Sequence, residues 1–179
     1  MSDWNGEDDV TQIVEGDTIP FGEYLRRVTP RRAHPVIWRS EALLRQLAGA
    51  PIAERGTVAL IGGDGADDAT IAPGLSCVIQ VILPAGRTEV HAHSFWHLCL
   101  VRSGSGVASI GDDGSEGALG EGDTLFIPAW CSHAFSNRGD APLIMMVIQN
   151  LPGLADAGTV VRQNGNEPVR VVYGDPVDA

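Results

Sequence analysis

The chain has 179 residues, 44% of them hydrophobic, which is enough for one ordinary domain with a proper core. Its formal net charge of −11 argues against binding to nucleic acid, because a phosphate backbone requires a concentrated basic surface. Residues 1–10 are polar and acidic, and no apolar run approaches membrane-spanning length, so we expect no signal peptide, no membrane contact and a cytoplasmic location. The three cysteines, Cys77, Cys99 and Cys131, lie in apolar segments and are expected to be reduced core thiols.

The N-terminal part shows little regular structure. Residues 1–20 lack a buried-face period, which predicts a flexible acidic leader before a single domain over residues 21–179. Ser40 is a good helix cap, and a short helix should run from it through Leu47 until Gly49 and Pro51 end it.

From Gly56 onward the chain consists of short β-prone runs separated by glycine, aspartate and proline. Even spacing of such runs favours an all-β fold with a closed or sandwiched antiparallel sheet at about residues 56–150, followed by a C-terminal extension over 151–179. We predict loops at 62–68 and 111–117. The expected strands cover residues 57–61, 75–83, 89–93, 96–101, 107–110, 124–127, 133–136, 143–149 and 168–173.

Four of the five histidines form the main chemical signal: His91, His93, His97 and His133. Residues two apart in a strand face the same side, so His91 and His93 can share one ion. His133, on a later strand, is the natural third ligand. Three neutral imidazoles suit Fe, Zn, Mn, Ni or Cu and leave positions open for water or substrate.

Two blocks of sequence surround these histidines. Residues 86–104 contain a glycine, an H-x-H pair, a further histidine and a closing glycine, and residues 122–137 contain G-D, a proline, a histidine and an asparagine. These blocks resemble the two sequence motifs of the cupin superfamily. The resemblance implies a cupin double-stranded β-helix, which is a jelly-roll barrel, in which His91, His93 and His133 bind a metal ion. The short N-terminal helix expected from Ser40 would precede this barrel.

The fourth position of the site departs from the common cupin pattern. Many cupins carry a glutamate seven residues before the glycine that closes the first motif, and here that position, counted from Gly104, is His97. His97 is therefore either a fourth ligand or a residue close to the ion that orients other groups.

Four further segments resemble the gentisate 1,2-dioxygenase group, which includes enzymes acting on salicylate and hydroxynaphthoate: residues 35–39, 54–55, 74–84 and 128–130. The similarity runs from about residue 35 to 151. It implies Fe(II), with O2 as cosubstrate, and ring cleavage of an aromatic hydroxy acid or related phenol. It also implies a homodimer, with the N-terminal arm or the last strand exchanged between subunits.

The same resemblance places individual residues in the pocket. Arg55 and Gln80 fall on positions that line the substrate pocket in that group, and with His97 they form the candidate catalytic set. Trp96 and Trp130 are candidates for stacking on an aromatic ring.

Two features depart from the group. Its members usually carry a further arginine on the strand after the H-x-H pair, where this chain has Leu98 and Cys99, so Cys99 is also a pocket candidate. They also typically contain two barrels, and this chain has room for one. These departures keep two alternatives open: a cupin isomerase, lyase or cyclase using Zn, Mn or Ni, and a cupin that binds a small molecule without turnover.

Overall fold

The computed structural model describes residues 17–27, 35–49, 56–62 and 70–171. Its contacts divide the chain into two units, Met1–Arg32 and Ala33–Ala179. The first unit contains helix α1 (Phe21–Arg27), in which the rings of Phe21 and Tyr24 stack with centroids 5.8 Å apart. None of the described helices is long and apolar enough to cross a bilayer.

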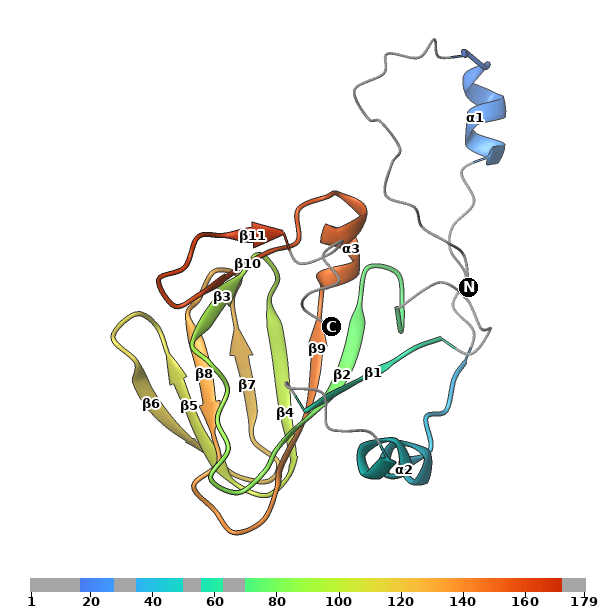
Figure 1. Ribbon diagram of the computed structural model, residues 1–179. Coiled ribbons are helices and arrows are strands. Elements are labelled where there is room, and N and C mark those ends of the chain that lie inside the picture. Colours follow the sequence, from blue (N-terminus) through green and yellow to red (C-terminus); the bar gives the residue numbers. More distant parts are fainter. Residues whose placement is uncertain (1–16, 28–34, 50–55, 63–69, 172–179) are drawn as a thin grey trace. The chain divides into compact units, whose positions relative to one another are not determined.

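The second unit is built almost entirely from strands (Figure 1). Its two helices are α2 (Ser40–Gly49) and α3 (Leu151–Asp156). Its strands are β1 (Thr57–Leu60), β2 (Ser76–Ile82), β3 (His91–His93), β4 (His97–Ser103), β5 (Gly106–Ile110), β6 (Ser115–Leu119), β7 (Thr124–Ile127), β8 (His133–Ser136), β9 (Leu143–Gln149), β10 (Val161–Asn164) and β11 (Arg170–Val171).

The strands form two sheets with antiparallel pairing. One sheet has the order β1-β2-β9-β4-β7 and the other the order β11-β10-β3-β8-β5-β6. Buried side chains from both sheets, among them Cys99, Val147 and Phe135, form one hydrophobic cluster between them. This arrangement confirms the expected all-β cupin barrel with few short helices.

Strand β9 shows why the sequence folds this way. Its residues alternate between buried and half-buried positions, so Leu143, Met145 and Val147 enter the core between the sheets. Full burial of a Leu or Met side chain contributes about 1.5–3 kcal/mol. On the opposite face of β9, Ile144 and Met146 pack against a second cluster.

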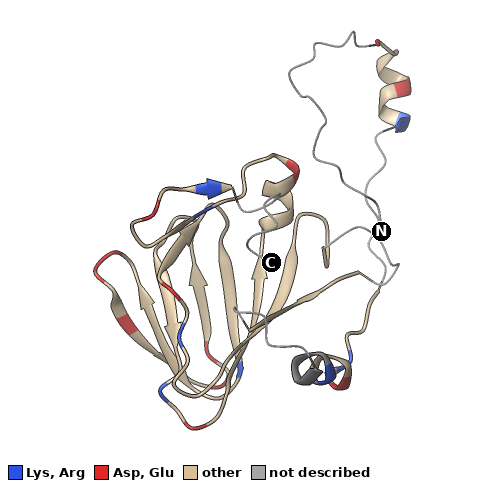
Figure 2. Cartoon of the chain, viewed as in Figure 1, with Lys and Arg blue, Asp and Glu red and all other residues tan. Residues whose placement is uncertain are grey.

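The second cluster covers the outer face of the five-stranded sheet. Leu60, Cys77 and Ile79 are its buried members, and Leu43 of α2 packs against them. The predicted helix beginning at Ser40 is therefore confirmed, and one of its apolar residues covers the sheet. The five strands themselves carry few charged residues, which Figure 2 shows as almost uniformly tan ribbons.

One expectation about secondary structure needs correction, and several elements were not expected. Residues 111–117 are not all loop, because β6 begins at Ser115 and pairs with β5. Four of its five residues are exposed, so it carries no alternating pattern and its pairing depends on the tight turn after β5, where Gly111 and Gly114 have positive φ. Helices α1 and α3 and strand β10 were not predicted either.

The remaining strand predictions hold within a few residues. The last predicted strand is shorter than expected where it is described, at Arg170–Val171. Residues 1–16, 63–69 and 172–173, which include most of the predicted leader and of one predicted loop, lie outside the described residues.

Candidate metal centre

Three histidines meet at one end of the six-stranded sheet. β3 carries His91 and His93, and β8 carries His133, which is the direct register partner of His91. One ring nitrogen from each of the three residues lies within 4.8 Å of the others, a geometry that could hold a metal ion. The structure therefore brings together the three histidines that the sequence analysis named as candidate ligands.

Each of the three rings is fixed by a backbone carbonyl two residues away. His91 Nδ1 contacts the Glu89 carbonyl at 2.8 Å. His93 Nδ1 contacts the Phe95 carbonyl at 2.7 Å, and His133 Nδ1 contacts the Cys131 carbonyl at 2.9 Å. A carbonyl only accepts, so each Nδ1 carries the proton and donates, which leaves Nε2 as the nitrogen with a lone pair.

The Nε2 atoms show that the site suits a metal ion. His93 and His133 are 2% and 1% exposed, and their Nε2 atoms are buried without a hydrogen-bond partner among the described residues. Buried polar atoms are nearly always satisfied in folded proteins. An ion bound by three neutral imidazoles would satisfy these atoms, and three protein ligands would leave further positions open.

The rings are electrically neutral at physiological pH. Burial lowers the pKa of His91 to about 3, and repulsion from His133 adds to this effect. Burial likewise lowers the pKa of His93 to about 3, with repulsion from His97 next in size. Burial also lowers the pKa of His133. Since only neutral imidazole binds a metal, the triad needs no proton release to become competent.

His97 approaches the triad from the opposite sheet. It begins β4, and its ring centroid lies 4.4 Å from that of His93 and 5.5 Å from that of His133. Its Nε2 atom is also buried without a partner among the described residues, although the His97 ring is not part of the three-residue cluster. Phe95 stacks on His93 with centroids 3.7 Å apart and planes inclined by 2°, which holds that ring in place.

A polar row crosses the inner face of the five-stranded sheet beside His97. Gln149 of β9 is the register partner of both His97 and Ser76, so the three side chains lie on one face. Ser76 and Gln149 are 6% and 8% exposed, and Ser76 Oγ has no partner in the part of the chain that the structure describes. This row places polar groups opposite the triad.

Burial lowers the pKa of His97 to about 3, and an interaction with the Gln149 side chain opposes the shift. The sequence patterns above did not single out Gln149 or Ser76. Gln149 could have been found, because it is the polar residue at an inward position of the otherwise apolar strand β9.

A hydrogen bond from the turn before β8 connects the motif block at residues 122–137 with the block at residues 86–104. The Trp130 N–H donates to the His93 carbonyl at 2.8 Å, and Trp130 has a φ of 64°, a strained conformation for a bulky residue. Its side chain is 52% exposed. Trp96 is half-buried and lies 6.1 Å from the ring of Phe126, so neither tryptophan is part of the histidine cluster.

The other predicted pocket residues lie further from the triad or outside the described chain. Gln80 of β2 pairs with Met145, two inward positions along the strand from Ser76. Cys99 is 1% exposed in the central hydrophobic cluster, and burial raises the pKa of its thiol to about 12. Arg55 lies outside the described residues.

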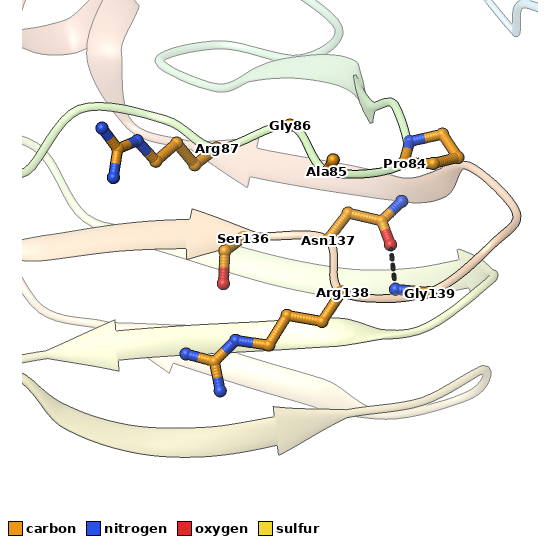
Figure 3. Close-up of a pocket in the computed structure, with 8 residues that line it drawn as sticks. All are labelled: Pro84, Ala85, Gly86, Arg87, Ser136, Asn137, Arg138 and Gly139. Carbon is orange, nitrogen blue, oxygen red and sulfur yellow. Dashed lines mark hydrogen bonds between the residues drawn. The ribbon is translucent and has the colours of Figure 1, made fainter.

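A second feature lies at the other end of β8. A hollow of about 520 Å³ is lined by residues 84–87 and 136–139 (Figure 3). There Asn137 Oδ1 accepts from the Gly139 N–H at 2.9 Å, and Arg138 forms an ion pair with Glu116. This hollow contains no histidine and no metal-binding cluster among its lining residues, so the candidate centre is the triad.

The two-sheet fold is a cupin fold, and its three clustered histidines could hold a metal ion. The family model of the cupin domain matches residues 78–149, which include all four clustered histidines.

The chain is also similar to curated proteins and solved structures. The chain is 32% identical over 85 residues to a 5-nitrosalicylic acid 1,2-dioxygenase from Bradyrhizobium sp., a match that covers 48% of this chain and 40% of that protein. Its fold is similar to salicylate 1,2-dioxygenase from Pseudaminobacter salicylatoxidans, with a TM-score of 0.69, 24% identity, and coverage of 91% of this chain and 45% of the other.

The G106A mutant of that enzyme, in complex with gentisate, gives a TM-score of 0.71 at 24% identity, covering 89% of this chain and 46% of the other. The chain thus spans about half the length of the relatives that it matches.

Proposed function

We propose that the protein is a mononuclear Fe(II) dioxygenase that cleaves the ring of a substituted aromatic hydroxy acid or a related phenol. The observation that carries the proposal is the triad of His91, His93 and His133, with each Nδ1 fixed by a carbonyl and the opposite nitrogens gathered at one point. Distant similarity to salicylate and nitrosalicylate dioxygenases supports it.

The chemistry matches the ligand set. Three neutral ligands leave the full positive charge of a divalent ion available, so when bound it would act as a Lewis acid toward a hydroxy-carboxylate and bring substrate and O2 together. A dioxygenase transfers both oxygen atoms of O2 to its product and needs no external reductant. The buried position of His93 and His133 excludes bulk water from that side of the site.

The neighbouring residues would orient the substrate. With a pKa of about 3, His97 is a poor general base, because an effective general base has a pKa near the working pH. We therefore assign to the His97 Nε2 atom the role of neutral hydrogen-bond acceptor or fourth ligand, with Gln149 holding the ring. Ser76 Oγ would hydrogen-bond to the substrate from the same row.

A His97→Asn variant separates the two roles. If His97 orients the substrate, the variant should bind one equivalent of metal with unchanged affinity and lose turnover. If His97 is a ligand, metal affinity itself should fall by about tenfold or more.

The remaining proposed residues have roles that mutation can test. Gln80 would line the part of the pocket that is more distant from the triad, Arg55 would bind the substrate, and Trp96, Trp130 and Cys99 would shape the walls of the pocket. We also propose a homodimer, which size-exclusion chromatography with light scattering would test directly.

The experiment that tests the function is O2 uptake by protein reconstituted anaerobically with Fe(II). The panel includes gentisate, salicylates, hydroxyanthranilates, aminophenols and catechols, and His133→Ala serves as the control that lacks a ligand. Stoichiometric O2 consumption with a ring-opened product, lost in the control, is the expected result. If the protein holds iron and no compound stimulates O2 uptake, ring cleavage is wrong and a non-oxidative reaction or simple binding replaces it.

A further inference from the structure

The C-terminal strand β10 places an arginine beside the histidine triad. β10 pairs with β3 so that Arg162 is the register partner of His93 and Asn164 that of His91. Directly paired residues in adjacent strands point to the same face of the sheet. Because His93 is buried toward the other sheet, Arg162 and Asn164 are on the inward face, and Val160, two residues earlier, is 1% exposed.

The position of the guanidinium is defined by its neighbour. Arg162 Nε donates to Asn164 Oδ1 at 2.6 Å, and both side chains are half-buried. This bond fixes the plane of the guanidinium within the strand end that adjoins the triad. Arg162 is thus a positioned cation and differs from its register partner on β11, Arg170, whose side chain is 69% exposed.

The charge of Arg162 reaches all four clustered histidines. It contributes to the lowered pKa of each of the four rings, after burial and, for three of them, after neighbouring histidines. Figure 2 also shows basic segments on β10 and β11. The field that Arg162 adds at the rings is therefore positive, and it favours a negatively charged group beside the triad.

We propose that Arg162 binds the carboxylate of an anionic substrate next to the triad and so determines the specificity of the site. The inference rests on the proposed function for the identity of the substrate as an aromatic hydroxy acid. A guanidinium offers two parallel N–H donors that match the two oxygens of a carboxylate, and in a half-buried site the attraction is stronger than at the surface. Arg162 would thereby supply an arginine from β10 where the strand after the H-x-H pair has Leu98 and Cys99.

The test compares two probes that differ only in the carboxylate. Salicylate and phenol are titrated into Zn-loaded protein by calorimetry, since zinc allows binding without turnover. In wild type, salicylate should bind at least about tenfold more tightly than phenol. Arg162→Gln should weaken salicylate binding by about 10- to 100-fold and change phenol binding by less than about twofold.

Two further variants distinguish a direct contact between Arg162 and the carboxylate from a general effect of positive charge near the site. Arg162→Lys keeps the charge and loses the planar fork, so it should retain part of the salicylate affinity. Arg170→Gln removes the neighbouring exposed charge and should change salicylate affinity by less than about twofold. Zinc stoichiometry and circular dichroism check that each variant is folded. If Arg162→Gln alone unfolds the protein, Arg162→Lys still tests the contact, because unchanged salicylate affinity in that variant would overturn the bidentate geometry.

The proposal is overturned if wild type does not prefer salicylate to phenol, or if Arg162→Gln and Arg170→Gln weaken salicylate equally. Failure of the dioxygenase function gives a different result. In that case salicylate would bind with the expected dependence on Arg162, but the Fe(II) protein would consume no O2.

Discussion

Metal binding at the triad should release almost no protons, because burial has already made the rings neutral. At pH 6.0 an imidazole with the ordinary pKa of about 6.5 holds about 0.76 of a proton, so three such ligands would release about 2.3 protons to an incoming ion. With a pKa of about 3, His91 and His93 hold almost none at that pH. The lowered pKa of His133 keeps its share below the ordinary value. The expected total is therefore below about 0.8 proton per ion.

Calorimetric titration of Co²⁺ into metal-free protein measures this number when it is repeated in two buffers of different ionisation enthalpy. At pH 7.5 even ordinary histidines would release only about 0.3 proton, so that pH provides the baseline. Affinity should weaken less than about fourfold between pH 7.5 and 6.0, whereas three ordinary histidines would give about 50-fold. Release of two or more protons at pH 6.0 would refute the argument that burial holds the triad neutral.

Three further predictions concern stability. The metal-free protein should be fully stable above about pH 6.5 and lose stability as pH falls toward 3, because the unfolded chain takes up protons that the folded rings exclude. At pH 5 the expected loss is about 2 kcal/mol for each of His91 and His93. Equal denaturation midpoints at pH 5 and 7 would contradict this. Asn137→Ala removes three hydrogen bonds and should cost about 2–4 kcal/mol in urea unfolding, with metal affinity unchanged. Gly104→Ala should lower the free energy of unfolding more than Gly114→Ala does, because a Cβ at Gly104 would lie 2.2 Å from the Pro142 carbonyl oxygen and a Cβ at Gly114 would meet open space. Equal losses of stability in the two variants would show that the backbone near Gly104 moves to relieve the contact.

Short β-prone runs in the sequence were sufficient to predict most of the barrel. β9 and β2 place apolar side chains on both faces of one sheet, and their strong β propensity predicted both strands within a residue or two. β6 and β10 escaped prediction because neither has an apolar pattern: β6 is an exposed edge, and the sequence of β10 is Val-Arg-Gln-Asn. Their pairing depends on partner strands that are set by the whole fold, which local propensity does not encode.

The positions of the three triad histidines could be predicted from strand geometry and from the two motif blocks. His91 and His93 share a face by strand geometry alone, and the two motif blocks identified His133 from a distant strand. Ser76 and Arg162 could not be found in that way, because each reaches the site only through its register with a neighbouring strand. Pairing register is a property of the folded sheet and left no local signal in the sequence.

A metal ion bound at the triad and the Arg162 guanidinium would place two positive charges side by side. A divalent ion on three neutral rings keeps its full charge, and Arg162 adds another at the neighbouring strand. An anion that chelates the ion and contacts the guanidinium would interact favourably with both charges, whereas a neutral ligand would gain from neither. The Ser76 Oγ and His97 Nε2 atoms on the opposite sheet have no partner among the described residues, and a ligand with hydrogen-bonding groups on its other side would satisfy them. Under the proposed function, a flat molecule carrying a hydroxyl and a carboxylate would meet these conditions, so we expect an aromatic hydroxy acid to bind more tightly than a neutral phenol.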